Sequence, residues 1–135
     1  MIYKKKGQGV GKINVPGGKL QDGESEEAAA IRECEEETGL TPHNLQLAGR
    51  LEFYFPRGNG WDNHCAVFRA RDYSGTLISE TDECTCEWVR VEKIPYEKMW
   101  DSDRVWTPLL LEGKIFHRSY EFDEKFSVAK EKIII

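Results

Sequence analysis

The chain has 135 residues, enough for one domain with a real hydrophobic core but not for two. Its 19 basic and 24 acidic residues give a net charge of −5, which argues against a general binder of polyanions such as nucleic acid. No apolar run approaches membrane-spanning length, and the basic N-terminal segment lacks the apolar core of a signal peptide.

The N-terminal segment predicts a short strand followed by a glycine-rich approach to a helix. Ile2–Lys6 has strand character, and its lysines, Lys4 among them, can lie over a phosphate group. Residues 7–11 form a flexible loop whose glycines are too irregular to indicate a phosphate-binding loop. Gly17 and Gly18 then permit main-chain atoms to approach a ligand or a metal closely.

A helix is expected next, and it carries the main chemical signal. It begins near Ser25 and ends at Gly39, because glycine takes the left-handed conformation that ends a helix at little cost. Three glutamates, Glu33, Glu36 and Glu37, are spaced i, i+3 and i+4 and therefore share one face. They lie near the helix C-terminus, where the helix dipole disfavours negative charge.

Such a face is often simply a solvated acidic surface. Here the fixed spacing of the three carboxylates favours a metal site instead. A hard divalent cation such as Mg²⁺ or Mn²⁺ would relieve the repulsion between them, because it binds clustered oxygen ligands.

The rest of the chain predicts strands and one further helix, an α+β fold with a mixed sheet. The expected elements are a strand over 45–55, a strand at His64–Arg71, a turn at Asp72–Gly75, an acidic loop at Glu80–Glu83, a strand at Cys86–Val91, a helix at Val105–Glu112 and β-prone segments at Phe116–Phe122 and Lys130–Ile135.

The four cysteines are expected to be reduced structural thiols of a cytoplasmic protein. Cys84 and Cys86 flank a single Thr, so on a strand both side chains point to one face rather than clasping zinc in a C-x2-C turn.

The helix and its approach match a known signature. Residues 18–40 fit G-x5-E-x7-R-E-U-x-E-E-x-G-U, where U is apolar, with Cys34 at one apolar position. Seven fixed residue types match by chance at one register with a probability on the order of 10⁻⁸. The pattern resembles the Nudix box of hydrolases that act on nucleoside diphosphates linked to another group. The resemblance implies a single Nudix domain over residues 1–135, with the box helix and a second helix packed on the sheet as an α/β/α sandwich.

Further similarity points to one branch, the oxidised-purine nucleoside triphosphatases (8-oxo-dGTPase, MutT-like). It is carried by KKKGQGVGKINVPGGK, Asp82-Glu83 through Trp88, Ile94-Pro95-Tyr96, Met99-Trp100, Trp106 to Leu111 and Phe116-His117. By resemblance, Trp100 stacks on the purine while Asn14 and Asp103 hydrogen-bond its edge. The chain departs from this branch in the base pocket, where Gln8 replaces an aromatic residue and Ser102 replaces the first of two adjacent aspartates.

The resemblance also implies a mechanism, in which water attacks phosphorus and a nucleoside triphosphate yields a monophosphate and pyrophosphate. Metal ions on Glu33, Glu36 and Glu37 would orient the water and lower its pKa. Either Glu36 or Glu83 accepts the proton, and Arg32 orients a neighbouring glutamate. The resemblance to this branch further implies a role in sanitation of the nucleotide pool.

Structural explanations and other functions stay open. Trp100 can be a core aromatic, Asp103 a helix N-terminal residue and Glu83 an ordinary loop carboxylate. The substrate can instead be ADP-ribose, a dinucleoside polyphosphate or a coenzyme. The chain can also be a relative of isopentenyl diphosphate isomerase, or a non-catalytic nucleotide-sensing or protein-binding module.

Proteins of this family normally carry a strand and turn before the segment matched by Ile2–Lys6. We expect the tail Lys130–Ile135, or a partner chain, to fill that place in the sheet. The expected partner is a small-molecule nucleotide, with no nucleic-acid polymer and no membrane, and the protein is expected to be a monomer or a homodimer.

Overall fold

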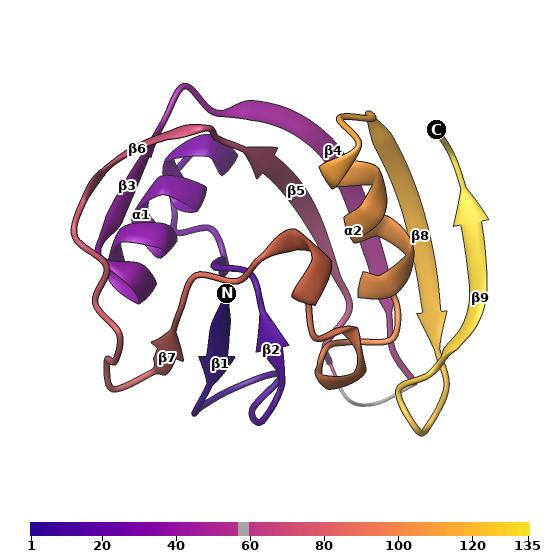
Figure 1. Ribbon diagram of the computed structural model, residues 1–135. Coiled ribbons are helices and arrows are strands. Elements are labelled where there is room, and N and C mark those ends of the chain that lie inside the picture. Colours follow the sequence, from indigo (N-terminus) through magenta and orange to yellow (C-terminus); the bar gives the residue numbers. More distant parts are fainter. Residues whose placement is uncertain (57–59) are drawn as a thin grey trace. The chain divides into compact units, whose positions relative to one another are not determined.

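The computed structural model describes residues 1–56 and 60–135 (Figure 1). These residues form two compact units. The first consists of Met1–Gln46 and Ala70–Lys98, and the second of Leu47–Arg69 and Met99–Ile135. Each unit therefore combines two stretches that are far apart in the sequence.

The first unit holds the predicted carboxylate helix and two small antiparallel sheets. One sheet has the strand order β2-β1-β7, and the other pairs β3 with β6. Its elements are β1 (Ile2–Lys4), β2 (Ile13–Asn14), α1 (Glu26–Thr38), β3 (Leu40–His43), β6 (Asp72–Gly75), β7 (Cys84–Cys86) and the 3-10 helices η1 (Val91–Lys93) and η2 (Tyr96–Lys98).

Helix α1 begins and ends where the sequence predicts. The Ser25 hydroxyl accepts a hydrogen bond from the Ala28 N–H at 3.1 Å, which satisfies one of the free donors of the first turn. Gly39 takes a left-handed conformation with φ of 78°, and its N–H donates to the Glu35 carbonyl at 2.9 Å. Both boundaries follow from local chemistry, so the helix prediction is confirmed.

The second unit is a four-stranded mixed sheet with the order β5-β4-β8-β9, in which β4 and β8 are parallel. Helix α2 contacts β8, and one core cluster contains Leu51, Trp106, Phe116 and Tyr120. The elements of this unit are most of β4 (Gln46–Tyr54), together with β5 (Asn63–Arg69), α2 (Asp103–Leu111), β8 (Phe116–Phe122) and β9 (Val128–Ile133).

The predicted α+β class is confirmed, but two local predictions are wrong. Asp72–Gly75, expected as a turn, is strand β6, because it pairs with Leu40–His43, a strand that its own sequence does not indicate. The strand expected at Cys86–Val91 is instead β7 at Cys84–Cys86. Its alternation was misleading, because Trp88 is 64% exposed rather than part of a buried face.

Cys84 and Cys86 both point into the core, at 1% and 7% exposure, as their spacing predicts. Cys34 and Cys65, like these two, are free thiols. Within the described part of the chain, no helix is both long enough and apolar enough to cross a membrane.

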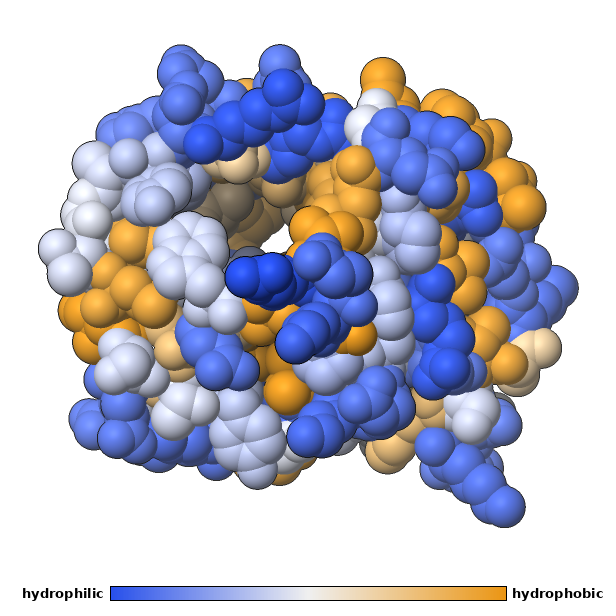
Figure 2. All heavy atoms as spheres, in the orientation of Figure 1, coloured by the Kyte–Doolittle hydropathy of each residue, from blue (hydrophilic) through white to orange (hydrophobic). Residues whose placement is uncertain are grey.

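The C-terminal tail forms strand β9, which runs antiparallel to β8 at the edge of the second unit's sheet. The backbone pairing continues beyond β9, because Ile134 N–H donates to the His117 carbonyl at 2.9 Å. Hydrophobic side chains are visible at the surface around this end of β9 in Figure 2, and Ile133 and Ile135 are 63% and 66% exposed. That the tail replaces an N-terminal strand stays a prediction.

Deleting Lys130–Ile135 should lower the free energy of unfolding by about 2–4 kcal/mol, because β8 loses most of its pairing with β9 and becomes an exposed edge. Urea unfolding and size-exclusion chromatography would measure stability and aggregation. Lys132→Ala, at an exposed position of β9, is the control and should change stability by less than about 0.5 kcal/mol. A truncation that stays monomeric and as stable as the full chain would contradict this role of the tail.

A polar network links three strands of the same sheet through Glu52. The Tyr54 hydroxyl donates to Glu52 at 2.9 Å and also contacts His64, while His117 Nε2 lies 2.5 Å from the other Glu52 oxygen. The hydrogen bond from Tyr54, followed by that from His117, lowers the pKa of Glu52. The ionised Glu52 carboxylate therefore stabilises the folded protein when pH is above the pKa that Glu52 has in the unfolded chain. This stabilisation is lost as pH falls through the lower pKa of Glu52 in the folded protein.

Wild type should accordingly be more stable than Glu52→Gln at pH 6 to 7, and the difference should shrink as pH falls from about 4.5 to 3. Urea unfolding of both proteins across this range would measure it. A stability difference that does not change with pH would show that the Glu52 charge contributes nothing.

Candidate active site

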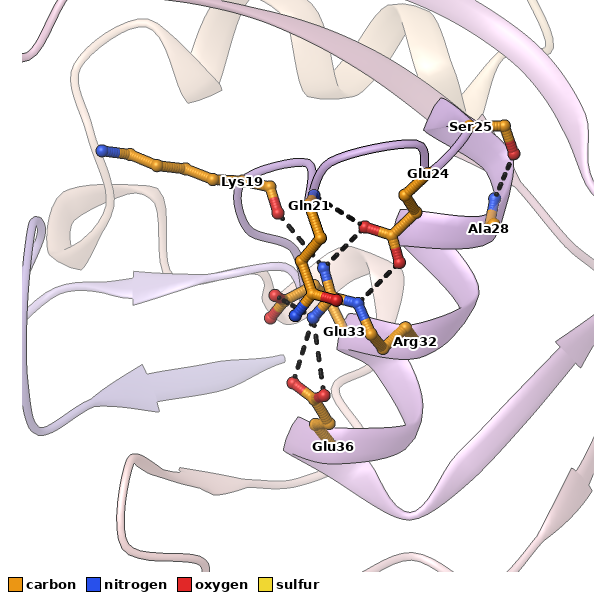
Figure 3. Close-up of polar contacts among 8 residues, drawn as sticks. All are labelled: Lys19, Gln21, Glu24, Ser25, Ala28, Arg32, Glu33 and Glu36. Atoms are coloured by element: carbon orange, nitrogen blue, oxygen red, sulfur yellow. Dashed lines mark hydrogen bonds and ion pairs between the residues drawn. The ribbon is translucent and has the colours of Figure 1, made fainter.

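Arg32 is the centre of a polar network that ties the segment before α1 to the helix (Figure 3). Its Nε and Nη2 atoms donate to the two carboxylate oxygens of Glu24 at 2.7 and 2.9 Å, a bidentate pair. Nη2 also donates to the Lys19 carbonyl at 3.1 Å. The Arg32 hydrogen bonds, with a smaller contribution from the Gln21 N–H, lower the pKa of Glu24 to about 2. Glu24 therefore stays ionised and holds the guanidinium in place.

The remaining nitrogen of Arg32 faces the predicted metal ligands. Nη1 donates to Glu33 at 2.7 Å and lies 3.3 Å from the nearer oxygen of Glu36. A Cβ atom at Gly18 would lie 2.5 Å from the Glu33 carboxylate carbon, so a larger residue there would displace the Glu33 carboxylate from this position. Arg32 thus orients Glu33 directly and contacts Glu36 only loosely. The Glu36 side chain is 57% exposed.

Glu37 is the buried member of the carboxylate face, at 5% exposure. One of its oxygens accepts a hydrogen bond from the Gly17 N–H at 2.8 Å. Burial raises the pKa of Glu37 to about 7, the Gly17 hydrogen bond opposes this, and the nearby negative charges of Glu33 and Glu83 add to it. Lys4 also lies within electrostatic reach and favours the ionised form. Lys4 is thus near the carboxylates, and its contact with a phosphate group stays a prediction.

A cavity of about 340 Å³ connects the helix to the acidic loop that precedes β7. Its lining residues are Glu36, Glu37, Thr81, Asp82 and Glu83. Glu83 is about fifty residues from the helix in sequence, yet it lies on the same cavity as two box glutamates. Its catalytic role stays a prediction, and the cavity supplies the geometry that such a role requires.

The donor set of this cavity suits a hard divalent cation, because it consists of carboxylates. In residues 1–56 and 60–135, however, no three Asp, Glu, His or Cys side chains converge as a preformed metal-binding group. Glu33 and Glu37 are instead engaged by Arg32 and the Gly17 N–H. Glu37 lines the cavity and Glu33 does not, and both carboxylates are hydrogen-bonded to protein groups.

The residues predicted to bind the base lie in different units. Asn14 belongs to the first unit, where its side-chain oxygen accepts the Val15 N–H at 2.8 Å. Trp100 and Asp103 belong to the second unit. A base pocket made of all three residues therefore stays a prediction.

Within the second unit, Asp103 has a clear structural role. It is 3% exposed at the start of α2, where its two oxygens accept the Trp100 backbone N–H at 3.1 Å and the Trp106 indole N–H at 2.9 Å. The Trp100 ring contacts Phe55, at 5.6 Å between centroids, and other aromatic rings. Both residues therefore have a structural role in the second unit, Asp103 as a hydrogen-bond acceptor at the start of α2 and Trp100 as a packed aromatic ring. A contact with a base would come in addition to these roles.

Sequence reasoning missed two participants. Glu24 fits the box, but its pairing with Arg32 depends on the bend before the helix, which no helical periodicity predicts. Asp82 adds a carboxylate to the cavity beside Glu83. The available signal was a threonine followed by two acidic residues, Thr81-Asp82-Glu83, because threonine favours a local turn through its hydroxyl.

The family is shown by comparison with known proteins. The model of the NUDIX domain matches residues 2–110, so the chain belongs to the Nudix family. The chain is 40% identical over 131 residues to the oxidized purine nucleoside triphosphate hydrolase of Danio rerio, covering 96% of this chain and 82% of that protein. It is 35% identical over 125 residues to the protein of the same name from Mus musculus, covering 93% and 79%.

The fold has a solved counterpart as well. The crystal structure of the MutT protein from Bacillus halodurans superposes with a TM-score of 0.82 at 23% identity, covering 98% of this chain and 88% of that one. This likeness concerns the fold alone, and it confirms a Nudix fold with mixed sheets and two helices.

Asp103→Ala should destabilise the protein by about 1–3 kcal/mol, because two N–H donors that Asp103 accepts lose their partner. Asp103→Asn keeps an acceptor oxygen and should lose less. Urea unfolding of the three proteins would measure the effect. Equal stability of wild type and Asp103→Ala would show that these hydrogen bonds contribute nothing.

Proposed function

We propose that the protein is a divalent-metal-dependent nucleoside triphosphate pyrophosphohydrolase. Its substrate is an oxidised purine nucleotide such as 8-oxo-dGTP, which it cleaves to the nucleoside monophosphate and pyrophosphate. The observation that carries this proposal is the cavity on which Glu36 and Glu37 meet Asp82 and Glu83. The names of the relatives from Danio rerio and Mus musculus support the substrate class.

Glu33, Glu36 and Glu37 would hold Mg²⁺ or Mn²⁺, with Glu83 beside them. When bound, the metal supplies neutralisation of phosphate charge and a lowered pKa for the attacking water. Arg32, fixed by Glu24, orients Glu33. Lys4 adds a positive charge for the phosphates. Glu36 or Glu83, both on the solvent-accessible cavity, accepts the proton from water.

At the base end, Trp100, Asn14 and Asp103 would contact the purine. Ser102 suggests a changed purine preference at the base end, because the oxidised-purine triphosphatases that the chain resembles have an aspartate at this position. Among the described residues, its fully buried hydroxyl has no hydrogen-bond partner. A neutral hydroxyl in place of a second carboxylate should narrow or shift the purine preference.

Residues 1–135 would act as one Nudix domain in the cytoplasm. The chain passes three times between the two compact units, so neither unit is a continuous segment able to fold from one stretch of sequence. The NUDIX match at residues 2–110 includes parts of both units. The four free thiols are consistent with a reducing compartment.

Glu36→Gln should nearly abolish turnover while leaving the fold intact. Glu36 is mostly exposed and contacts Arg32 only at 3.3 Å or more, so the loss of its charge relieves repulsion rather than breaking a buried pair. Pyrophosphate release and thermal unfolding would be measured together. Glu35→Gln, at an exposed position one residue away on the same helix, is the matched control. A Glu36→Gln protein that keeps most of its activity would contradict the metal-site proposal.

The substrate class is tested by a pyrophosphate-release screen of oxidised and ordinary nucleotides, ADP-ribose and dinucleoside polyphosphates, with and without Mg²⁺. Hydrolysis of oxidised purine triphosphates in preference to the others supports the proposal. Preference for another nucleoside diphosphate derivative would assign a different Nudix activity. No turnover of any nucleotide would favour a nucleotide-sensing module.

Asp103→Ala should lower kcat/KM for purine triphosphates by roughly 10- to 100-fold while changing pyrimidine triphosphates little. Because the same substitution lowers stability, the informative quantity is the purine-to-pyrimidine ratio in samples confirmed to be folded. Loss of structure reduces activity on every substrate equally and leaves the ratio unchanged. An unchanged ratio would remove Asp103 from the base pocket.

A further inference from the structure

The Thr81 hydroxyl makes several hydrogen bonds within the loop that brings Asp82 and Glu83 to the cavity. Thr81 Oγ1 accepts the Glu83 N–H at 3.3 Å and the Cys84 N–H at 3.2 Å, and it lies 3.3 Å from the Cys84 carbonyl. The Thr81 N–H also donates to that carbonyl at 2.8 Å. Thr81 thus closes a tight turn in which Asp82 and Glu83 form the tip.

Lys5, the residue after strand β1, fixes the same loop. Its backbone N–H donates to the Glu83 carbonyl at 2.8 Å. Its ammonium donates to the Thr81 carbonyl at 2.8 Å and pairs with Glu80 at 2.5 Å. The Lys5 ammonium is therefore bound to the loop. The phosphate-binding charge of the proposed site is assigned to the neighbouring Lys4 and not to Lys5.

The turn is joined to the carboxylate helix at its base. Cys84, 1% exposed, follows the loop and places its Sγ 3.5 Å from the Glu37 carbonyl. The base of the turn is thus fixed against α1, while the side chains of Asp82 and Glu83 remain exposed on the cavity. The direction of the Glu83 carboxylate then depends on the hydrogen bonds inside the turn.

We infer that Thr81 is a positioning residue for Glu83, and that Lys5 supports it by anchoring the loop backbone. This inference rests on the proposed function, since it concerns how Glu83 reaches the metal and water end of that site. Groups that orient a metal-site carboxylate commonly change metal affinity or activity by roughly 10- to 100-fold when removed. Neither Thr81 nor Lys5 needs to touch substrate for this.

The test compares Thr81→Val, which has nearly the same shape without the hydroxyl, with Thr81→Ser, which restores it. Thr76→Val, at an exposed position of the same unit, controls for the general effect of the replacement. Binding of Mn²⁺ to the nucleotide-free proteins would be followed by electron paramagnetic resonance, and kcat and KM by pyrophosphate release. Thermal unfolding would be recorded for each protein.

Thr81→Val should weaken Mn²⁺ binding and lower kcat by roughly 10-fold or more, with KM nearly unchanged, while Thr81→Ser and Thr76→Val resemble wild type. In a Glu83→Gln background the same replacement should change kcat by less than about 2-fold, because the two residues act as one unit. Lys5→Met should shift both measurements in the same direction, and it serves as the second variant if Thr81→Val does not fold.

The inference would be overturned if Thr81→Val kept wild-type Mn²⁺ binding and kcat. It would also be overturned if Thr81→Val lowered kcat by the same factor in the wild-type and the Glu83→Gln backgrounds. An inactive wild type would overturn the proposed function instead. The Mn²⁺ titration would then still decide whether Thr81 positions a metal-site carboxylate.

Discussion

Repulsion among the carboxylates of α1 is the constraint on which the rest of the site depends. Three glutamates on one face, at the end of the helix where the dipole is negative, would oppose helix formation if nothing offset them. Arg32 offsets the charge from within the helix, and Glu24 holds Arg32 by two short hydrogen bonds. The glycines before the helix complete the arrangement, because Gly18 leaves space for Glu33 and Gly17 donates to Glu37.

The three glutamates are consequently not equivalent. Glu33 is oriented by a cation, Glu37 is buried with a pKa near 7, and Glu36 is largely exposed. A cation arriving at this face would favour the ionised form of Glu37 and would compete with Arg32 for Glu33 and Glu36. The site therefore favours the binding of a positive charge. When no cation is bound, the glutamates interact with protein groups instead.

Local chemistry explains which parts of this arrangement the sequence could predict. The helix, its caps and the shared carboxylate face depend on residues within about fifteen positions, so spacing was enough. Strand β6 and the Glu24–Arg32 pair could not be predicted in this way. The first exists because Leu40–His43 pairs with it, and the second depends on a bend of the backbone outside any repeating element. For Glu83, family resemblance supplied the residue, but only the cavity shows where it lies.

The two ends of the proposed site differ in how much structural work their residues already do. Glu36 and Glu83 are exposed residues that line the cavity, so their place there is better explained by chemistry than by folding. Asp103 is the opposite case, because both of its oxygens already accept hydrogen bonds from tryptophan N–H groups. A carboxylate that also organises the protein presents a fixed acceptor to a ligand at low entropic cost, which favours discrimination between bases over raw affinity. Catalysis would thus rest on freely accessible carboxylates, and selectivity on one that folding has already immobilised.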